Sequence, residues 1–149
     1  MQFKVHIPFV ELLGMALIRF EPGQCEIHQT LRDELTNSYG VAHGGVTMAL
    51  LDVVMAHAAR TPHEAGGEVL SGVVTIEMKT SFTRPGLGRL IATGKRLHGA
   101  ASMAFCEGYV HDEMGLLVAH ASGTFKYMKA LPVGSGPDGR RIQKLNPPV

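Results

Sequence analysis

Residues 44–59, GGVTMALLDVVMAHAA, form a long and almost entirely apolar stretch. Only three polar side chains interrupt it, those of Thr47, Asp52 and His57. An arginine and a proline follow within three residues, so we expect a helix of about 24 Å that ends there. A helix that is apolar all round is usually covered by other structure. The rest of the chain must therefore wrap around this segment.

The segments on both sides of this helix have the pattern of β-strands. Apolar and polar side chains alternate in VTIEMK at 74–79, and Pro-Gly or Gly-containing turns separate the segments. Consecutive strands joined by short turns favour an antiparallel sheet, here curved around the central helix in an α+β architecture. The expected elements are helices at 8–14 and 44–59 and strands at 15–21, 24–31, 70–83, 88–98, 102–112 and 116–128.

The composition indicates one folded domain. With 149 residues, 45% hydrophobic and 18% charged, the chain is neither disordered nor long enough for two typical domains. We place the domain at 1–130 and a Pro- and Gly-rich tail at 131–149. A net charge of +1 argues against nucleic acid as the main ligand. No apolar run is long enough to span a membrane, and no signal peptide is evident, so no membrane partner is expected.

The cysteines and histidines indicate the compartment and argue against a metal site. Cys25 and Cys106 are isolated and far apart, which is not a disulfide framework. We expect a protein of a reducing compartment, the cytoplasm. The eight histidines show no spacing typical of metal ligands, so no metal is expected.

Asp52 is the first candidate for chemistry. Its helical neighbours three and four positions away are Met48, Ala49, Met55 and Ala56, all apolar. A carboxylate in such a place is costly to bury without a partner. Either Asp52 pairs with a buried arginine or caps a loop, or it faces a small polar pocket where it can act on a ligand.

The second candidate is the Gly-rich segment GVAHGG at 40–45, which opens the helix. The first N–H groups of a helix lack internal partners and carry the positive end of its dipole. At Gly44 and Gly45 a ligand can approach these donors without meeting a side chain, as at an oxyanion or phosphate site. The alternative is a tight turn in which glycine serves conformation alone.

The spacing of the two candidates predicts a dimer. Gly44 and Asp52 are eight residues apart, or about 12 Å along a helix. One straight helix cannot bring both to the same carbonyl group, because donor and base must lie within hydrogen-bond reach of the reacting atoms. If both act in one reaction, they come from two chains related by a two-fold axis.

The helix-opening residues also show a family resemblance. Asn37, Gly40, His43-Gly44-Gly45 and Asp52 fit the pattern N-x-x-G-x-x-H-G-G-(x)6-D. The chain thus resembles the hotdog-fold acyl-CoA thioesterases of the phenylacetic acid degradation type, over roughly residues 10–128. The resemblance implies a hotdog fold, an acyl-CoA substrate, no cofactor beyond the substrate's own coenzyme A, and a homodimer or dimer of dimers with shared active sites.

The resemblance also implies roles for individual residues. The Gly44 N–H would polarise the thioester carbonyl, and Asn37 would help to position that carbonyl or the attacking water. Asp52 of the partner subunit would be the general base or the nucleophile. Thr75 stands where similar enzymes carry a Ser or Thr that orients the water or the carboxylate. His43 would brace the turn rather than transfer a proton.

Other residues are candidates for substrate binding. Basic residues cluster between Glu77 and Glu107 with no acid among them, and they would hold the phosphates of coenzyme A or simply form a solvated strand surface. Apolar residues near the helix would line an acyl pocket. The basic candidates are Arg84, Arg89, Lys95 and Arg96, and the others are Gly45, Met48, Met55, Met78 and Phe82.

Two other functions remain as alternatives to thioester hydrolysis. A non-catalytic acyl-CoA-binding module would have the same fold, but a polar residue at Asp52 would then be superfluous. An acyl-CoA hydratase or dehydratase would need a histidine paired with a carboxylate, for which His43 is the candidate. The acyl group itself is not specified by the sequence.

Overall fold

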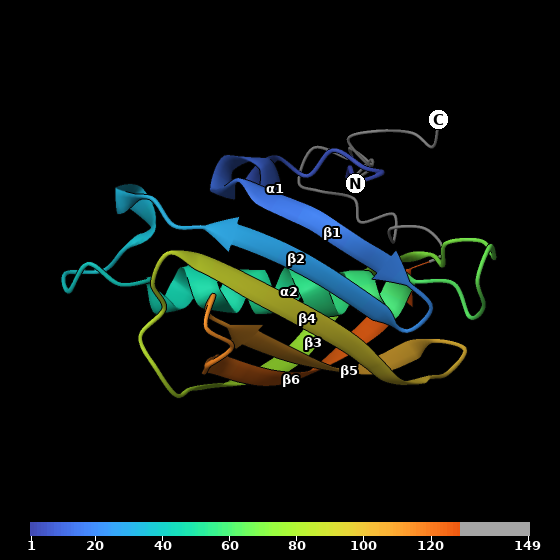
Figure 1. Cartoon of the computed structure of the whole chain (residues 1–149). Helices are drawn as coiled ribbons and strands as arrows, with labels where there is room; N and C mark the ends of the chain where they lie inside the picture. Colours follow the sequence, from blue (N-terminus) through green and yellow to red (C-terminus); the bar gives the residue numbers. More distant parts are fainter. Residues whose placement is uncertain (129–149) are drawn as a thin grey trace, which may run out of the picture.

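The computed structural model describes residues 1–128, and the expected tail at 131–149 lies outside them. A six-stranded antiparallel sheet curves around one long helix, α2 (Figure 1). This is the expected α+β architecture, and each expected element is present within two residues of its expected bounds. The elements are α1 (Pro8–Leu13), β1 (Met15–Glu21), β2 (Gln24–Thr30), a 3-10 turn (Asp33–Leu35), α2 (Gly44–Arg60), β3 (Gly72–Phe82), β4 (Arg89–Gly99), β5 (Met103–His111) and β6 (Leu117–Met128).

The strand order places β3 at one edge of the sheet. The order is β1-β2-β4-β5-β6-β3, so β3 and β4 are consecutive in the chain but separated by two strands. The six-residue loop 83–88 therefore crosses the end of the sheet, close to the start of α2. There the Ala42 N–H donates to the Gly86 carbonyl over 2.9 Å. Gly86 has to be small, because a Cβ would lie 2.9 Å from Leu90 and 3.0 Å from Ala42.

Glycines on the sheet allow α2 to approach it closely. A Cβ at Gly94 of β4 would lie only 2.5 Å from the backbone oxygen of Val54 in α2. Gly108 of β5 and Gly123 of β6 lie under the Met55 side chain, at ideal Cβ distances of 3.0 and 3.1 Å. The helix can therefore rest directly on the concave face of the sheet.

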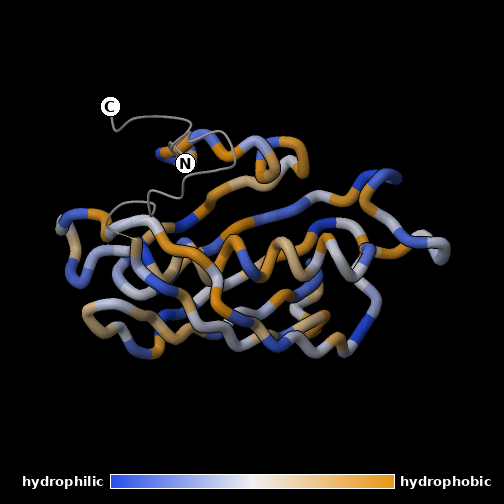
Figure 2. The backbone as a smooth tube through the Cα atoms, turned by 180° about the vertical axis from the view of Figure 1, so that it is seen from behind, coloured by the Kyte–Doolittle hydropathy of each residue, from blue (hydrophilic) through white to orange (hydrophobic). Residues whose placement is uncertain are grey.

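Most of α2 is enclosed, as its composition requires. Hydrophobic residues recur along the helix and on the strands around it (Figure 2). Leu50, Leu51, Val54 and Met55 are fully buried, together with the Phe125 ring of β6. Among residues 1–128 no helix is both long and apolar enough to cross a membrane.

Candidate functional site

The start of α2 has one backbone donor without a partner. His43 is the N-cap residue, and its Nδ1 accepts a hydrogen bond from the Gly45 N–H over 2.9 Å. The N–H groups of Val46 and Thr47 donate to the His43 carbonyl. Within residues 1–128 the Gly44 N–H has no such acceptor. The positive end of the helix thus leaves one donor for a ligand, at the glycine that the sequence singled out.

A cavity of about 380 Å³ opens beside this donor. Its walls come from the loop before α2, the first turn of α2, the loop between β3 and β4, and one residue each of β3 and β6. The cavity brings together four predicted residues that are far apart in the sequence. Its lining residues are Asn37, Val41, Ala42, Gly44, Thr47, Phe82, Thr83, Arg84, Pro85, Gly86 and Val118.

Asn37 organises the loop that forms one wall. Its side-chain oxygen accepts hydrogen bonds from the N–H groups of Tyr39, over 2.9 Å, and Val41, over 3.4 Å. Its carbonyl accepts from the Gly40 N–H, and Gly40 has a φ of 72°, where glycine is favoured. With the side-chain oxygen used in this way, the amide N–H₂ remains as a donor, with no hydrogen bond of its own among residues 1–128.

Asp52 lies on the side of α2 that faces β3. Its Oδ1 accepts a hydrogen bond from the Thr75 hydroxyl over 2.6 Å. The side chain is only partly buried. In the part of the chain that the structure describes, no lysine or arginine forms an ion pair with it. The structure therefore does not support the interpretation of Asp52 as half of a buried salt bridge.

The Gly44 N–H and the Asp52 carboxylate lie near opposite ends of β3. The Phe82 ring, at the last residue of β3, is 3.6 Å from the ideal Cβ position of Gly44. Thr75, near the beginning of β3, contacts Asp52. Asp52 does not line the cavity beside Gly44. Within one chain the carboxylate and the free N–H are therefore at separate places.

Two predicted binding residues have structural roles instead. The Arg96 guanidinium donates to the carbonyls of Ala59, Thr61 and Pro62 at the end of α2, over 2.7–3.2 Å. Its charge thus complements the negative end of the helix dipole, and its donors are used there. Met55 is fully buried between the helix and the sheet, so it belongs to the core and not to an acyl pocket.

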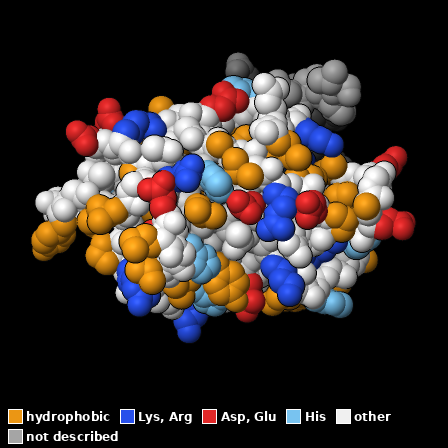
Figure 3. Space-filling view, viewed as in Figure 1, with side chains coloured by type: hydrophobic (Ala, Val, Ile, Leu, Met, Phe, Trp, Pro, Cys, Tyr) orange, Lys and Arg blue, Asp and Glu red, His pale blue; other side chains and the backbone are white. Residues whose placement is uncertain are grey.

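The other basic candidates lie on the surface. Arg84 lines the cavity, and its guanidinium donates to the Leu117 carbonyl over 3.2 Å. Arg89 forms an exposed ion pair with Glu113 at 3.4 Å. Lys95 is exposed on β4, beside Glu107 of β5 in the register. On the face shown in Figure 3 charges of both signs are interspersed with apolar side chains, as on a solvated surface. Arg84 is thus the basic candidate that reaches the cavity.

The remaining predicted residues flank the helix start or the edge strand. Met48 and Phe82 are 39% and 53% exposed, which is high for large apolar side chains. Gly45 is exposed, although its N–H is used by His43. Met78 is half-buried and packs against the core. Sequence reasoning did not identify Thr83, Gly86 and Val118 as cavity residues, and the only signal was the turn chemistry of Pro85-Gly86.

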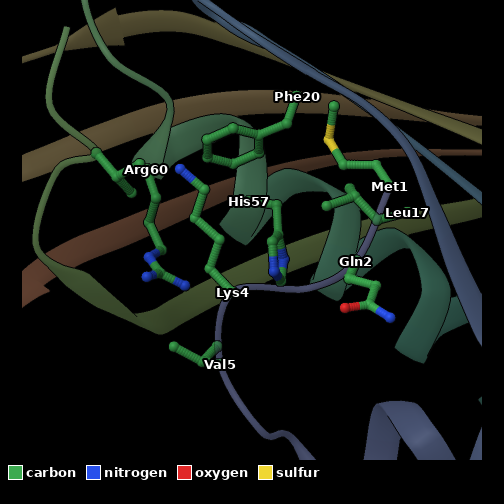
Figure 4. A pocket seen from close by; sticks show the side chains of 9 residues that line it. Met1, Gln2, Lys4, Val5, Leu17, Phe20, His57 and Arg60 are labelled. Atoms are coloured by element: carbon green, nitrogen blue, oxygen red, sulfur yellow. The ribbon is translucent and has the colours of Figure 1, made fainter. Parts of the chain in front are cut away.

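A second, much smaller cavity lies at the other end of α2. It measures about 30 Å³, far less than the cavity beside Gly44, and it is formed around His57, Arg60, Lys4 and Phe20 (Figure 4). The His57 ring hydrogen-bonds to the Val53 carbonyl over 2.8 Å, and burial lowers the pKa of His57 to about 4. His57 is thus neutral at ordinary pH, and this cavity is too small for an organic substrate.

The arrangement of histidines does not favour dehydratase chemistry. Within residues 1–128, the histidines that contact a carboxylate are His6, with Glu11, and His28, with Glu26. Neither lies in the 380 Å³ cavity. His43 instead accepts a backbone hydrogen bond. In the same range no three His, Cys, Asp or Glu side chains are grouped so that they could hold a metal ion.

Comparison with known proteins identifies the family. The model of the thioesterase superfamily matches residues 39–119. The medium/long-chain acyl-CoA thioesterase YigI of Escherichia coli K12 is 30% identical over 135 residues, which cover 83% of this chain and 87% of YigI.

Solved structures agree with this assignment. Conserved protein PA5202 from Pseudomonas aeruginosa has a TM-score of 0.75 at 27% identity, over 84% of this chain and 97% of that one. A variant of the phenylacetic acid degradation protein PaaI from Thermus thermophilus has a TM-score of 0.71 at 29% identity, over 82% and 100% of the two chains. The resemblance read from the helix-opening motif and the expected hotdog fold are thereby confirmed. The chain belongs to the thioesterase superfamily and is a hotdog-fold thioester hydrolase of the phenylacetic acid degradation type.

Proposed function

We propose that this enzyme hydrolyses the thioester bond of acyl-CoA molecules in active sites shared between two subunits. One subunit provides the cavity with the Gly44 N–H and Asn37, and the other provides Asp52 held by Thr75. The proposal is supported by one observation above all. The free helix donor and the unpaired carboxylate lie at opposite ends of β3, an edge strand that pairs only with β6 among the described residues.

The exposed edge of β3 favours a second copy of the chain as its partner. β3 has eleven residues, and Val74 and Ile76 are 38% and 53% exposed. A long apolar edge strand is prone to pair with another strand. Antiparallel pairing of two β3 strands about a two-fold axis would bring the Thr75 end of each strand beside the Phe82 end of the other. Asp52 of the partner subunit would then approach the cavity beside Gly44.

The chemistry follows from this arrangement. The thioester carbonyl oxygen accepts a hydrogen bond from the Gly44 N–H, assisted by the Asn37 amide, and its carbon becomes more electrophilic. Acting as a base, Asp52 takes a proton from water, and the hydroxide adds to the carbonyl carbon. The tetrahedral intermediate collapses, the C–S bond breaks, and the coenzyme A thiolate takes up the proton. As a nucleophile, Asp52 would instead attack the carbonyl carbon and displace the coenzyme A thiolate, and water would then cleave the resulting mixed anhydride to the free acid and the Asp52 carboxylate.

The walls of the cavity suit a substrate with an apolar and an anionic part. Phe82 in the cavity wall offers exposed apolar surface, and Met48, on the first turns of α2 outside the wall, offers more. Arg84 offers a positive charge for the phosphates of coenzyme A. The resemblance to YigI, whose name specifies medium- and long-chain acyl-CoA, makes these chain lengths the first substrates to test. The proposed reaction uses no cofactor besides the coenzyme A of the substrate.

Release of free thiol from a panel of acyl-CoA substrates tests the proposal. Wild-type protein should release thiol, and Asp52→Asn should lose about 100-fold or more of kcat, because the amide can neither accept the proton of water nor attack as a carboxylate. Binding of a non-hydrolysable acyl-CoA analogue should persist in this variant. Wild-type turnover that survives in Asp52→Asn would remove Asp52 from the mechanism, and binding without any wild-type turnover would favour the binding-module alternative.

A further inference from the structure

Thr47 is a buried polar residue for which the proposed mechanism has no role. It lines the cavity beside Gly44, and its residue surface is only 2% exposed. Three other polar residues of the described chain are comparably buried, namely Gln29, His57 and Thr61. Each of these three makes a side-chain hydrogen bond to a backbone carbonyl. The Thr47 hydroxyl makes none among residues 1–128.

The missing hydrogen bond is unusual for a threonine in a helix. A helical threonine commonly donates to the carbonyl three or four residues earlier, here Gly44 or His43. The His43 carbonyl instead accepts from the N–H groups of Val46 and Thr47. Within residues 1–128, four polar side-chain atoms are fully enclosed and have no hydrogen-bond partner, and the Thr47 oxygen is not one of them. Since this oxygen also has no partner, it must be part of the small exposed surface of the residue. Thr47 lines the cavity, so the oxygen faces it.

Helix geometry directs this hydroxyl toward the Gly44 N–H. Thr47 lies three positions after Gly44, so both are on the same face of α2. The Cα–Cβ bonds of a helix tilt toward its N-terminus, and a side chain covers the turn before its own Cα. Gly44 has no side chain of its own that could lie between the hydroxyl and its N–H. The backbone donor and the side-chain donor thus converge on one region of the cavity.

We propose that the Thr47 hydroxyl is a further hydrogen-bond donor to the carbonyl oxygen of the bound thioester, beside the Gly44 N–H and the Asn37 amide. This inference rests on the proposed function and adds a catalytic residue to it. A donor aimed at this oxygen is more useful when the oxygen becomes negative in the tetrahedral intermediate than when it belongs to the neutral thioester. Thr47 should therefore contribute to kcat more than to KM.

Two substitutions separate the hydroxyl from the packing of the side chain. Thr47→Val keeps the shape and β-branching but removes the donor, whereas Thr47→Ser keeps the donor and removes a methyl group. With an acyl-CoA substrate that wild type cleaves, we expect Thr47→Val to lower kcat about 10- to 100-fold, with KM changed by about twofold or less. Thr47→Ser should retain kcat within about threefold of wild type. Thr93→Val, which removes a hydroxyl from β4 outside the cavity, is the matched control and should leave kcat unchanged.

A spectroscopic measurement gives an answer that does not depend on turnover. The infrared carbonyl band of a bound ketone analogue of acyl-CoA, with a methylene group in place of the sulfur, reports the hydrogen bonds to its oxygen. In Thr47→Val this band should move to higher frequency, and in Thr47→Ser it should stay at the wild-type position. An unshifted band in Thr47→Val, or equal losses of kcat in Thr47→Val and Thr47→Ser, would refute the role of the hydroxyl. A shifted band in a protein that turns over no acyl-CoA would support Thr47 as a carbonyl donor and contradict the proposed hydrolysis.

Discussion

A shared active site predicts that two inactive variants can restore each other. Asn37→Ala damages the half of the site that contains the cavity, and Asp52→Ala damages the half that contains the carboxylate. A heterodimer of the two variants has one site with both changes and one site with neither. Because one of two sites is then intact, the purified heterodimer should show about half the wild-type kcat per dimer. Each parent homodimer carries a defect in both sites and should be far less active.

The assay is thiol release by heterodimers purified through two different affinity tags after co-expression. A heterodimer of Asp52→Ala with Asp52→Asn is the matched control. Both changes affect the same half-site, so each of its sites lacks the carboxylate and no recovery is expected. If the Asn37→Ala/Asp52→Ala heterodimer were as inactive as its parents, the two residues would not come from different subunits, and the antiparallel pairing of β3 inferred above would be wrong.

Two further predictions concern stability. Gly94→Ala should destabilise the fold by about 1–3 kcal/mol and lower Tm by several degrees, because its Cβ would lie 2.5 Å from a backbone oxygen of α2. Gly108→Ala should cost less, because its Cβ would meet side-chain carbons of Met55 and Leu51 at 3.0 and 3.1 Å and not the backbone. Equal losses of Tm in the two variants would contradict this. Burial lowers the pKa of His57 from about 6.5 in the unfolded chain to about 4 in the fold. As pH decreases from about 6.5 to 4, His57 should therefore lower the free energy of unfolding by about 3 kcal/mol in total. In denaturant titrations the free energy of unfolding of His57→Gln should depend less on pH than that of wild type, and an equal pH dependence would mean that His57 is not the group responsible.

The architecture was predictable because the central helix leaves few ways to cover it. An apolar helix needs a surrounding layer, and the later segments alternate and turn like strands, so a sheet around the helix could be predicted. The position of β3 at the edge of this sheet could not be predicted. The β6 residues that pair with it are 37 to 56 positions away in the chain, and the loop 83–88 has the composition of an ordinary hairpin turn. Only long-range pairing decides that this loop crosses the sheet and forms a wall of the cavity.

A site residue could be predicted where its type is unusual for its position in the helix. Asp52 stands among apolar neighbours, and Gly44 opens a helix, so their residue types indicated chemistry. Arg96 was misinterpreted because a basic residue on a strand gives no sign of its partner, which here is the end of α2. Met55 was misinterpreted because an all-apolar helix does not reveal which face lies on the sheet. Thr47 was seen as one of three polar residues of the helix but not as a candidate for function, because a single hydroxyl in a helix normally bonds to its own backbone.

The close packing of α2 on the sheet connects the core to the candidate site. The height of the helix above the sheet is limited by Gly94, which leaves no room for even one carbon atom beside Val54. Two residues earlier on the same helix, Asp52 reaches sideways to Thr75 on β3 at 2.6 Å. Because a hydrogen bond weakens over a few tenths of an ångström, the carboxylate can keep this contact only if the helix stays at that height. The glycines under α2 are therefore part of what positions the carboxylate, although none of them touches it.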